Sequence, residues 1–531
     1  MSQDSPAPDG VSARRAVDDT PGEPAGPARR VAPGRSFSGA LGWTVLGTMI
    51  PGLGLLKAGR RVAGSLVLGA FLLLIGGGVY LALNRDLATR LAVAPGVLQG
   101  VAIGLGVGAL AWVLVIGFTH LSLRPANPGI GQRVAGAAVV GLLSFVVAAP
   151  MAFGANLAWT AGNALDTIIG TDDTPNSTQP TINVEDPWKD KDRLNILIIG
   201  GDSGTGRSAS QGDRTDTVIV ASIDTHSGAT TLFTLPRNTE KMPFPKDSPL
   251  HKYYPNGFTS GSTDLYTRSQ FLLNAMYRVV PTKVPHDVLG KTKDFGASVM
   301  KVSVGEALGL QVDYFVKVNM DGFKDFINAM GGITLNVNYR IPIGGQTDAH
   351  IKPTDYIEPG PNQHMNGREA LWYARGRYGL DDYKRMERQR CVINAVVQQT
   401  TPDKVLANFQ AIAAAGENTI TTDVPRNMLS NLATLGLKVK NTKLRSVTFT
   451  PGVAGFKSYD PDWAKVQARV KKALKETAAG VEPTPTASAS GTPTASGSAT
   501  PTSTASPTKS STAKAKSDDL EEVCGYHPEK G

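Results

Sequence analysis

Three long apolar runs in the first third of the chain constrain its fold more than any other feature. They cover residues 62–83, 97–123 and 134–160, and none of them contains Lys, Arg, Asp or Glu. Each reaches the roughly 20 residues that a helix needs to cross the hydrocarbon core of a bilayer. A helix of a soluble bundle would show a polar face, and these runs show none. The sequence therefore predicts three transmembrane helices, within a membrane region over residues 39–162.

A fourth apolar stretch, residues 41–56, is shorter and is interrupted by Pro51-Gly52. We expect it to lie at the membrane interface or to re-enter the bilayer, with an additional span as the alternative. A fourth span would place the arginine-containing N-terminus outside the cell, which the distribution of positive charge disfavours.

The positions of Lys and Arg predict the orientation, because loops that carry them stay in the cytoplasm. Lys57, Arg60 and Arg61 precede the first span, and Arg124 and Arg133 separate the second from the third. With both segments inside, the N-terminus is cytoplasmic and everything after the third span is extracytoplasmic. We thus expect a multi-pass protein of the plasma membrane that contacts the lipid bilayer.

Composition divides the rest of the 531-residue chain. Residues 1–38 are predicted to be a disordered cytoplasmic tail, and residues 163–192 a polar extracytoplasmic stem. Residues 477–531, rich in Pro, Thr, Ser and Ala, are predicted to be a disordered C-terminal tail. Between them, residues 193–476 alternate strand and helix patterns, which is typical of a layered α/β domain. The expected strands are 195–200, 217–223, 230–235, 314–318, 333–337 and 445–450, and the expected helices are 302–310, 323–330, 369–374, 383–397 and 462–475.

Charge and cysteine usage exclude several classes of protein. The net charge of +9 is modest and forms no dense basic block with interleaved aromatic residues, so we expect no nucleic-acid partner. Two cysteines, Cys391 and Cys524, are too few for a disulfide-stapled miniprotein or a Cys-rich zinc module. We expect a buried thiol and an exposed tail thiol, with a disulfide in the oxidising exterior as the alternative.

Two aspartates are candidate metal ligands. Asp202 follows Gly200-Gly201 at the end of a predicted strand, and Asp216 stands just before the next strand. Adjacent strand ends bring two carboxylates together, and such a pair suits Mg²⁺ or Mn²⁺ while leaving positions for water and phosphate oxygens. The alternative is that both aspartates fix turns, as is common near Gly and Ser.

Arginines form a second candidate site. On the predicted helix 383–397, Arg385, Arg388 and Gln389 are spaced i, i+3 and i+4 and share one face. Converging guanidinium groups repel one another unless an anion holds them, and their planar donors match phosphate oxygens. The alternative is a solvated helix face with pairs such as Asp381–Arg385.

Three further arginines come from outside that helix. Arg375 and Arg377 precede it, and Arg237 follows the predicted strand 230–235, where a solvated side chain is the alternative. Together with a metal held by the aspartates, these groups suit a pyrophosphate, since phosphoryl transfer needs mainly positioning and charge neutralisation. The chain has no P-loop, no kinase signature set, no HExxH and no Gly-x-Ser-x-Gly motif.

A series of short motifs runs along residues 193–475. The main ones are Asn-Ile-Leu-Ile-Ile-Gly-Gly-Asp ending at Asp202, Arg-Thr-Asp-Thr around Asp216, Leu-Pro-Arg ending at Arg237, Val-Asp-Tyr-Phe-Val-Lys-Val-Asn ending at Asn319, Arg375-Gly376-Arg377, and Asp382-Tyr383-Lys384-Arg385 with Glu387-Arg388-Gln389. In this order they resemble the LytR-CpsA-Psr family of cell-envelope proteins.

The resemblance implies an extracytoplasmic, three-layer α/β/α domain with a central mixed sheet, tethered to the membrane by the preceding helices. It also implies a phosphotransferase. Such an enzyme moves a glycopolymer from a polyprenyl-pyrophosphate carrier onto peptidoglycan with Mg²⁺ and releases polyprenyl phosphate. A non-catalytic scaffold that binds polyprenyl phosphates and an uncoupled lipid pyrophosphatase are the alternatives. A transcriptional regulator is disfavoured because the N-terminal tail shows no helix-turn-helix pattern.

The family's functional residues transfer to matching positions of this sequence. Asp202 and Asp216 would hold the metal, and Asp382 would orient or deprotonate the acceptor hydroxyl. Five arginines would bind the pyrophosphate and act in catalysis, with Gln389 beside them: Arg237, Arg375, Arg377, Arg385 and Arg388. The chain departs from the family at Asn238, where an acidic residue is usual, and its Lys-Ile-Asn stretch before a tyrosine is not recognisable.

Overall fold

The computed structural model describes most of the membrane region and most of the domain that follows it. Most of the predicted N-terminal tail, part of the stem and most of the C-terminal tail lie outside the described residues. The chain divides into two compact units, one built from residues up to 72 with 111–147 and the other from residues 73–110 with 148 onward. The described residues are 36–84, 87–88, 91, 96–169, 178–180, 186–203, 214–347, 350–401, 420–480 and 517–528.

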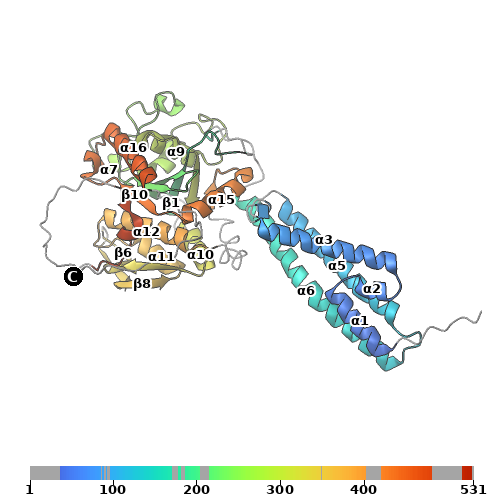
Figure 1. The fold of residues 1–531 in the computed structure, drawn as a ribbon. Helices are drawn as coiled ribbons and strands as arrows, with labels where there is room; N and C mark the ends of the chain where they lie inside the picture. Colours follow the sequence, from blue (N-terminus) through green and yellow to red (C-terminus); the bar gives the residue numbers. More distant parts are fainter. Residues whose placement is uncertain are drawn as a thin grey trace, which may run out of the picture. The chain divides into compact units, whose positions relative to one another are not determined.

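Three helices of the described chain are long and apolar enough to cross a membrane: α3 (Arg61–Leu83), α5 (Val97–Leu123) and α6 (Ile130–Ile169). They coincide with the three predicted runs, although α6 begins before residue 134 and continues past residue 160. These helices are coloured blue to cyan in Figure 1.

The fourth apolar stretch forms two helices, α1 (Phe37–Met49) and α2 (Leu53–Lys57), which are separated at Pro51-Gly52. Neither reaches the length of a span. Gly52 has a φ of 99°, and a Cβ there would lie 2.5 Å from the carbonyl oxygen of Gly64. The break therefore depends on glycine, which alone tolerates both the backbone angle and the close approach.

A seven-stranded mixed sheet forms the centre of the second unit, with the strand order β11-β10-β3-β2-β1-β4-β9. Four neighbouring pairs are antiparallel and two are parallel, β1 with β4 and β3 with β10. The strands are β1 (Arg193–Gly201), β2 (Thr215–Asp224), β3 (Thr230–Thr234), β4 (Tyr314–Val318), β9 (Ile420–Thr422), β10 (Leu444–Thr448) and β11 (Asp518–Asp519).

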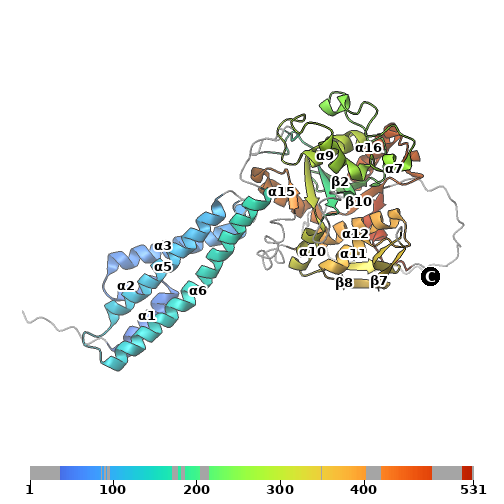
Figure 2. The same ribbon diagram turned by 180° about the vertical axis from the view of Figure 1, so that it is seen from behind.

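Helices cover both faces of this sheet, as Figures 1 and 2 show from opposite sides. Because successive strand residues point to opposite faces, Leu197 and Ile199 of β1 pack into one apolar cluster and Ile198 packs into another. The domain is thus a three-layer α/β/α structure. The first face carries α8 (Leu273–Val279), α9 (Phe295–Leu308) and α16 (Trp463–Ala479), and the second carries α12 (Asp382–Gln399), α15 (Leu429–Lys440) and α17 (Leu520–Val523).

A smaller subregion beside α12 contains two antiparallel two-stranded sheets, β5 with β8 and β6 with β7, outside the central sheet. Its elements are α10 (Met320–Ala329), β5 (Ile333–Val337), β6 (Ile341–Gln346), β7 (Ile351–Ile357), β8 (Gly360–Met365) and α11 (Gly367–Arg375). The remaining short helices are η2 (Pro249–Lys252), α7 (Leu265–Ser269), η3 (Val280–Thr282), η4 (Arg426–Met428) and η5 (Val453–Gly455).

The predicted strands and helices of residues 193–476 are all present. Strands 314–318 and 333–337 have the predicted bounds, the others have different ends, and β6, β7, β8, β9, α7, α8 and α15 were not predicted. The largest difference is α9, which begins at Phe295 rather than at residue 302. Asp294 caps it by accepting a hydrogen bond from the backbone N–H of Ala297 at 3.0 Å. The extra turns contain Gly, Ser and Lys, which hid the helical pattern, yet they are buried.

A buried ion pair ties α9 to the sheet. Lys301 is 2 % exposed, and its Nζ lies 2.7 Å from Asp423 Oδ2 and 2.8 Å from the carbonyl oxygen of Asp313. Asp423 accepts a further hydrogen bond from the backbone N–H of Phe315. Every charge is paired, as burial requires.

The expectation of a disordered tail over residues 477–531 is wrong in two places. Helix α16 continues to Ala479, and residues 517–528 form β11, α17 and a following turn. β11 pairs with β10, and Leu520 is completely buried against the second face of the sheet. Averaged composition concealed these last residues, because the Pro/Thr/Ser stretch before them dominates the window.

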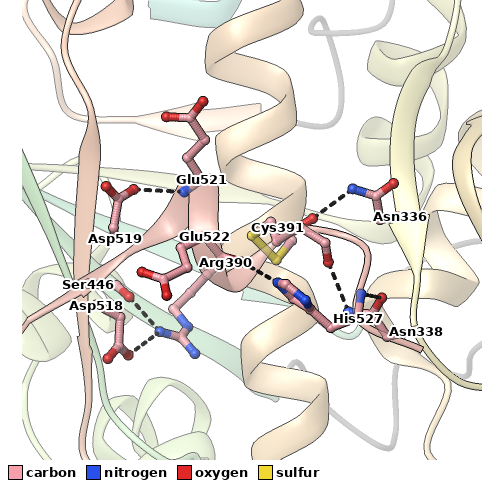
Figure 3. The surroundings of a disulfide bond; sticks show 12 residues. Asn336, Asn338, Arg390, Cys391, Ser446, Asp518, Asp519, Glu521, Glu522 and His527 are labelled. Carbon is pink, nitrogen blue, oxygen red and sulfur yellow. Dashed lines mark hydrogen bonds and ion pairs between the residues drawn. A yellow bond between two sulfur atoms is a disulfide. The ribbon is translucent and has the colours of Figure 1, made fainter. Parts of the chain in front are cut away.

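The expectation of two separate thiols is also wrong, since Cys524 forms a disulfide with Cys391 of α12 (Figure 3). Polar contacts reinforce the bridge. Asn336 donates to the carbonyl oxygen of Cys524 at 2.9 Å, and the buried guanidinium of Arg390 contacts Asp518 at 3.4 Å. The C-terminal segment 517–528 is therefore attached, by a disulfide and an ion pair, to the helix that carries the predicted arginine face.

Replacing Cys524 with Ser is expected to lower the free energy of unfolding by about 2–4 kcal/mol, because a link across 133 residues restricts the unfolded chain. Denaturant unfolding of the full chain in detergent measures this loss. Reductant should destabilise the unaltered chain by a similar amount and leave Cys524→Ser unaffected. Equal stability of the two chains under oxidising conditions would contradict a stabilising role for the bridge.

Candidate functional site

The two predicted metal ligands lie at the same end of two neighbouring interior strands of the central sheet. β1 and β2 are antiparallel, and Gly201 pairs with Thr215, so Asp202 and Asp216 lie at the same end of the two strands. The backbone N–H of Asp202 donates to the carbonyl oxygen of Arg214 at 2.9 Å. Both aspartates line a cavity of about 440 Å³.

Residues from the α11–α12 region add polar side chains to the lining of this cavity. Arg375 ends α11, Arg377 lies in the following turn, and Arg385 and Gln389 stand on α12, and all four line it. The predicted helical face is therefore real, but it is buried rather than solvated, since Arg385 is 2 % exposed. The alternative pair Asp381–Arg385 does not form. Instead Asp381 caps α12 by accepting from the N–H of Lys384.

Four side chains form a closed ring of alternating charge, called here the Asp–Arg ring. Arg237 NH1 lies 2.9 and 3.0 Å from the two carboxylate oxygens of Asp216, and its Nε lies 3.4 Å from Asp382 Oδ1. Arg385 completes the ring, with NH2 at 2.9 Å from Asp382 Oδ1 and NH1 at 3.9 Å from Asp216 Oδ2. The ring connects the start of β2, the loop after β3 and the start of α12.

Arg375 and Asp202 form a second pair beside the Asp–Arg ring, 3.4 Å apart. The guanidinium of Arg375 also lies over the ring of Trp372, 5.0 Å from its centroid. These contacts hold the guanidinium of Arg375 beside Asp202.

Arg388 has a different role from the other arginines. It lines neither the 440 Å³ cavity nor the larger one described below. Its guanidinium is buried, donates to the carbonyl oxygen of Gly376 and lies 5.6 Å from the ring centroid of Tyr339. Because Gly376 stands between Arg375 and Arg377, Arg388 fixes the turn that presents these two arginines.

The charges of the site control its ionisation. Burial alone would raise the pKa of Asp216, but Arg237 and Arg385, with a hydrogen bond from Asn274, hold that pKa below its ordinary value. Burial lowers the pKa of Arg385 to about 10 against the opposing effect of Asp382, so this arginine is still charged at neutral pH. Asp216, Arg237 and Arg385 are therefore ionised under physiological conditions.

The rest of the 440 Å³ cavity is apolar. It runs between the sheet and helices α10, α11 and α12, and its walls include Val316, Val318, Phe323, Leu371 and Ile393. The sequence analysis assigned no residue to such a space, because apolar side chains that line a cavity and those that fill a core have the same pattern. A second cavity of about 720 Å³ shares Arg375 and Arg377 with the first and adds Arg237 and Asp382.

Asn274 of α8 is a site residue that the sequence analysis missed. Its Nδ2 lies 3.4 Å from Asp216 Oδ1, and its backbone N–H donates to the carbonyl oxygen of Arg237 at 2.9 Å. A signal was present, since Asn274 precedes Tyr277 as the asparagine of the family pattern precedes its tyrosine. Leu272-Leu273 in place of Lys-Ile concealed it.

A divalent cation would find only part of its ligands in the protein. Within the described ranges, no three side chains of His, Cys, Asp or Glu come together as a metal site. Asp202 and Asp216 supply hard oxygen donors at one cavity, and Mg²⁺ is commonly bound by one or two carboxylates together with substrate phosphates. The donor set thus fits a cation that arrives with, or is completed by, a phosphate ligand.

Comparison with known proteins agrees with the motifs. The model of the LytR_cpsA_psr family matches residues 160–476. A similar protein is the Enterococcus faecalis polyisoprenyl-teichoic acid–peptidoglycan teichoic acid transferase TagU, 26% identical over 64% of this chain and 96% of its own length. The Bacillus subtilis protein of the same name is 26% identical over 44% of this chain and 61% of its own length.

Among solved structures, a Streptococcus agalactiae protein is similar at 25% identity, with a TM-score of 0.39, over 55% of this chain and 90% of its own. The crystal structure of Bacillus subtilis TagV is similar at 23% identity, with a TM-score of 0.36, over 55% of this chain and 99% of its own.

The lowered pKa of Asp216 predicts how stability depends on pH. The stability that its ionised form contributes is complete above the unfolded pKa near 3.8 and is lost only as the pH falls through the lower folded value. The difference in unfolding free energy between the unaltered chain and Asp216→Asn should stay constant from about pH 7 to 5 and change below about pH 4. Asp355→Asn, at an exposed position on β7, is the control. A difference that changes between about pH 7 and 5 would show that burial dominates instead.

Proposed function

Because the chain belongs to the LytR-CpsA-Psr family, we propose that it is a membrane-anchored phosphotransferase. It moves a glycopolymer from a polyprenyl-pyrophosphate carrier onto peptidoglycan and releases polyprenyl phosphate. The observation that carries the proposal is the amphiphilic 440 Å³ cavity, whose apolar walls end at two carboxylates and a group of guanidiniums. An apolar chain with a charged head is the ligand that matches such a cavity.

Charge supports a diphosphate at this site. Arg375, Arg377 and Arg385 line the 440 Å³ cavity, and Arg237 lines the adjoining 720 Å³ cavity. Each phosphate of a pyrophosphate diester carries one negative charge, which guanidinium groups attract. The planar donors of Arg375, Arg377 and Arg385 are suited to its oxygens.

The proposed reaction is the displacement of polyprenyl phosphate by an acceptor hydroxyl. The hydroxyl oxygen forms a bond to the glycan-bearing phosphorus, and the bond from that phosphorus to the bridging oxygen breaks. Polyprenyl phosphate leaves with the electron pair, and the hydroxyl proton passes to Asp382. In the structure Asp382 Oδ1 forms ion pairs with both arginines of the ring, Arg237 and Arg385. Its Oδ2 is buried without a hydrogen-bond partner among the described residues.

Asp202 and Asp216 would hold Mg²⁺, with Mn²⁺ as an alternative. When bound, the cation would neutralise phosphate charge and stabilise the leaving group. Asn274 would orient Asp216 for this role through its amide, and Arg375 would orient Asp202. The buried arginines exclude water from the phosphorus and keep their positions during the reaction.

The Enterococcus and Bacillus relatives are named as transferases of a polyisoprenyl-linked polymer to peptidoglycan, which supports this reaction class. The polymer of those proteins is teichoic acid. For this chain the proposal is a glycopolymer, with the scaffold and the uncoupled pyrophosphatase as outcomes of the test below.

The proposed location is the plasma membrane, with α3, α5 and α6 as three spans, a cytoplasmic N-terminus and an extracytoplasmic catalytic domain. The three apolar helices support anchoring. The Lys and Arg residues around them support the orientation.

Alanine at Asp202 or Asp216 should reduce transfer by about 10²-fold or more, because the charge that positions and neutralises the diphosphate is lost. The assay uses the full chain in detergent, a labelled polyprenyl-pyrophosphate glycan and nascent peptidoglycan, with and without Mg²⁺. Asp355→Ala is the control. Unchanged transfer by both variants removes their proposed role. Donor binding without turnover indicates a scaffold, and label released as free glycan phosphate indicates a pyrophosphatase.

Single cysteines test the proposed topology in a chain whose native cysteines are both serine. A cysteine at Ser2 should be protected from an impermeant maleimide on intact cells, and one at Ser458 should react. Labelling of both positions would support a fourth span, and labelling of Ser2 alone would invert the orientation.

A further inference from the structure

The 720 Å³ cavity has a composition that the lipid and its diphosphate do not account for. It shares Arg375 and Arg377 with the apolar cavity, but its other walls come from β6, the turn after α11 and the Asp–Arg ring. Trp372 and Tyr378 supply aromatic surface, and Gln346 supplies an amide. Polar and aromatic groups of this kind suit a ligand with both hydroxyl groups and apolar faces.

The close approach of β6 to Tyr378 depends on glycine. Gly344 and Gly345 have φ values of 77° and 80°, and a register shift falls between Ile343 and Gly344. A Cβ at Gly345 would lie 3.1 Å from Tyr378 Cδ2 and 3.0 Å from the backbone N of Pro353. The two glycines thus allow the strand to bend against the tyrosine and form one wall of the cavity.

The geometry of phosphoryl transfer gives this cavity a place in the reaction. The attacking and leaving oxygens lie roughly in line on opposite sides of the phosphorus. If the phosphorus is held by Arg375 and Arg377, with polyprenyl phosphate toward the apolar cavity, the attacking hydroxyl must come from other walls that reach the same arginines. The 720 Å³ cavity does so, and Asp382 lines it.

We propose that the 720 Å³ cavity binds the acceptor, a saccharide unit of a glycan strand, and directs one of its hydroxyl groups toward Asp382. This inference rests on the proposed transferase function and adds the acceptor's binding site to it. A sugar ring packs its C–H face on Tyr378. The side-chain amide of Gln346 accepts hydrogen bonds from the sugar hydroxyl groups or donates hydrogen bonds to them. The hydroxyl oxygen bonds to phosphorus, its proton goes to Asp382, and polyprenyl phosphate leaves with the electrons of the broken P–O bond.

The test separates acceptor binding from donor binding in the full chain in detergent. Donor affinity is measured by calorimetry with a short-chain prenyl-pyrophosphate-linked N-acetylglucosamine, without acceptor. Initial rates of transfer to uncrosslinked peptidoglycan strands then give the KM for the acceptor. Two variants alter the cavity: Tyr378→Ala removes the aromatic surface, and Gln346→Trp fills the space from an exposed strand position.

Both variants should raise the acceptor KM by roughly tenfold, as expected for the loss of one aromatic contact, and leave donor affinity within about twofold. The matched control is Tyr356→Ala on β7, a tyrosine that lies 3.8 Å from the guanidinium of Arg340 and does not line the cavity. This control should change neither quantity.

Three outcomes overturn the inference. If the acceptor KM of both cavity variants equals that of Tyr356→Ala, the cavity does not bind the acceptor. If donor affinity falls instead, the cavity holds the glycan of the donor. If the unaltered chain neither binds the donor nor transfers its glycan, the proposed function itself fails and the inference fails with it.

Discussion

The candidate site depends on the mutual neutralisation of charges in the partly buried Asp–Arg ring. Two guanidiniums at the positions of Arg237 and Arg385 would repel each other, and two carboxylates would do the same. Alternation of the two signs lets Asp216 and Asp382 compensate both. The ring therefore lets one small volume hold two guanidiniums close together before any phosphate is bound.

The fold brings the ring together from distant parts of the chain. β2 supplies Asp216, the loop after β3 supplies Arg237, and α12 supplies the other two members. Helix α12 is held near its middle, since the C-terminal segment 517–528 is attached to it through Cys391 and Arg390. A segment that the sequence places more than 120 residues away thus helps to hold the arginine helix against the sheet.

Local patterns predicted six strands and five helices of the domain, because alternation and helical spacing are recorded within each segment, but they missed elements such as β6–β9, α8 and α15. They also located Asp202 and Asp216 at strand ends and Arg385 on a helical face. The remaining features depend on contacts between distant segments: the cavity walls, the contact of Asn274 with Asp216, and the docking of residues 517–528. The role of Arg388 could not be separated from those of its neighbours, because the helical spacing that groups it with Arg385 does not reveal its bond to Gly376.

A crystal structure of the catalytic domain with a short-chain prenyl pyrophosphate and Mg²⁺ tests directly whether the 440 Å³ cavity binds the lipid donor. We expect the prenyl chain between the sheet and α10–α12, with phosphate oxygens contacting Arg375, Arg377 and Arg385. We also expect the cation between the phosphates and the two strand-end aspartates. Phosphates bound away from these arginines, or a prenyl chain outside the apolar cavity, would contradict the proposed function.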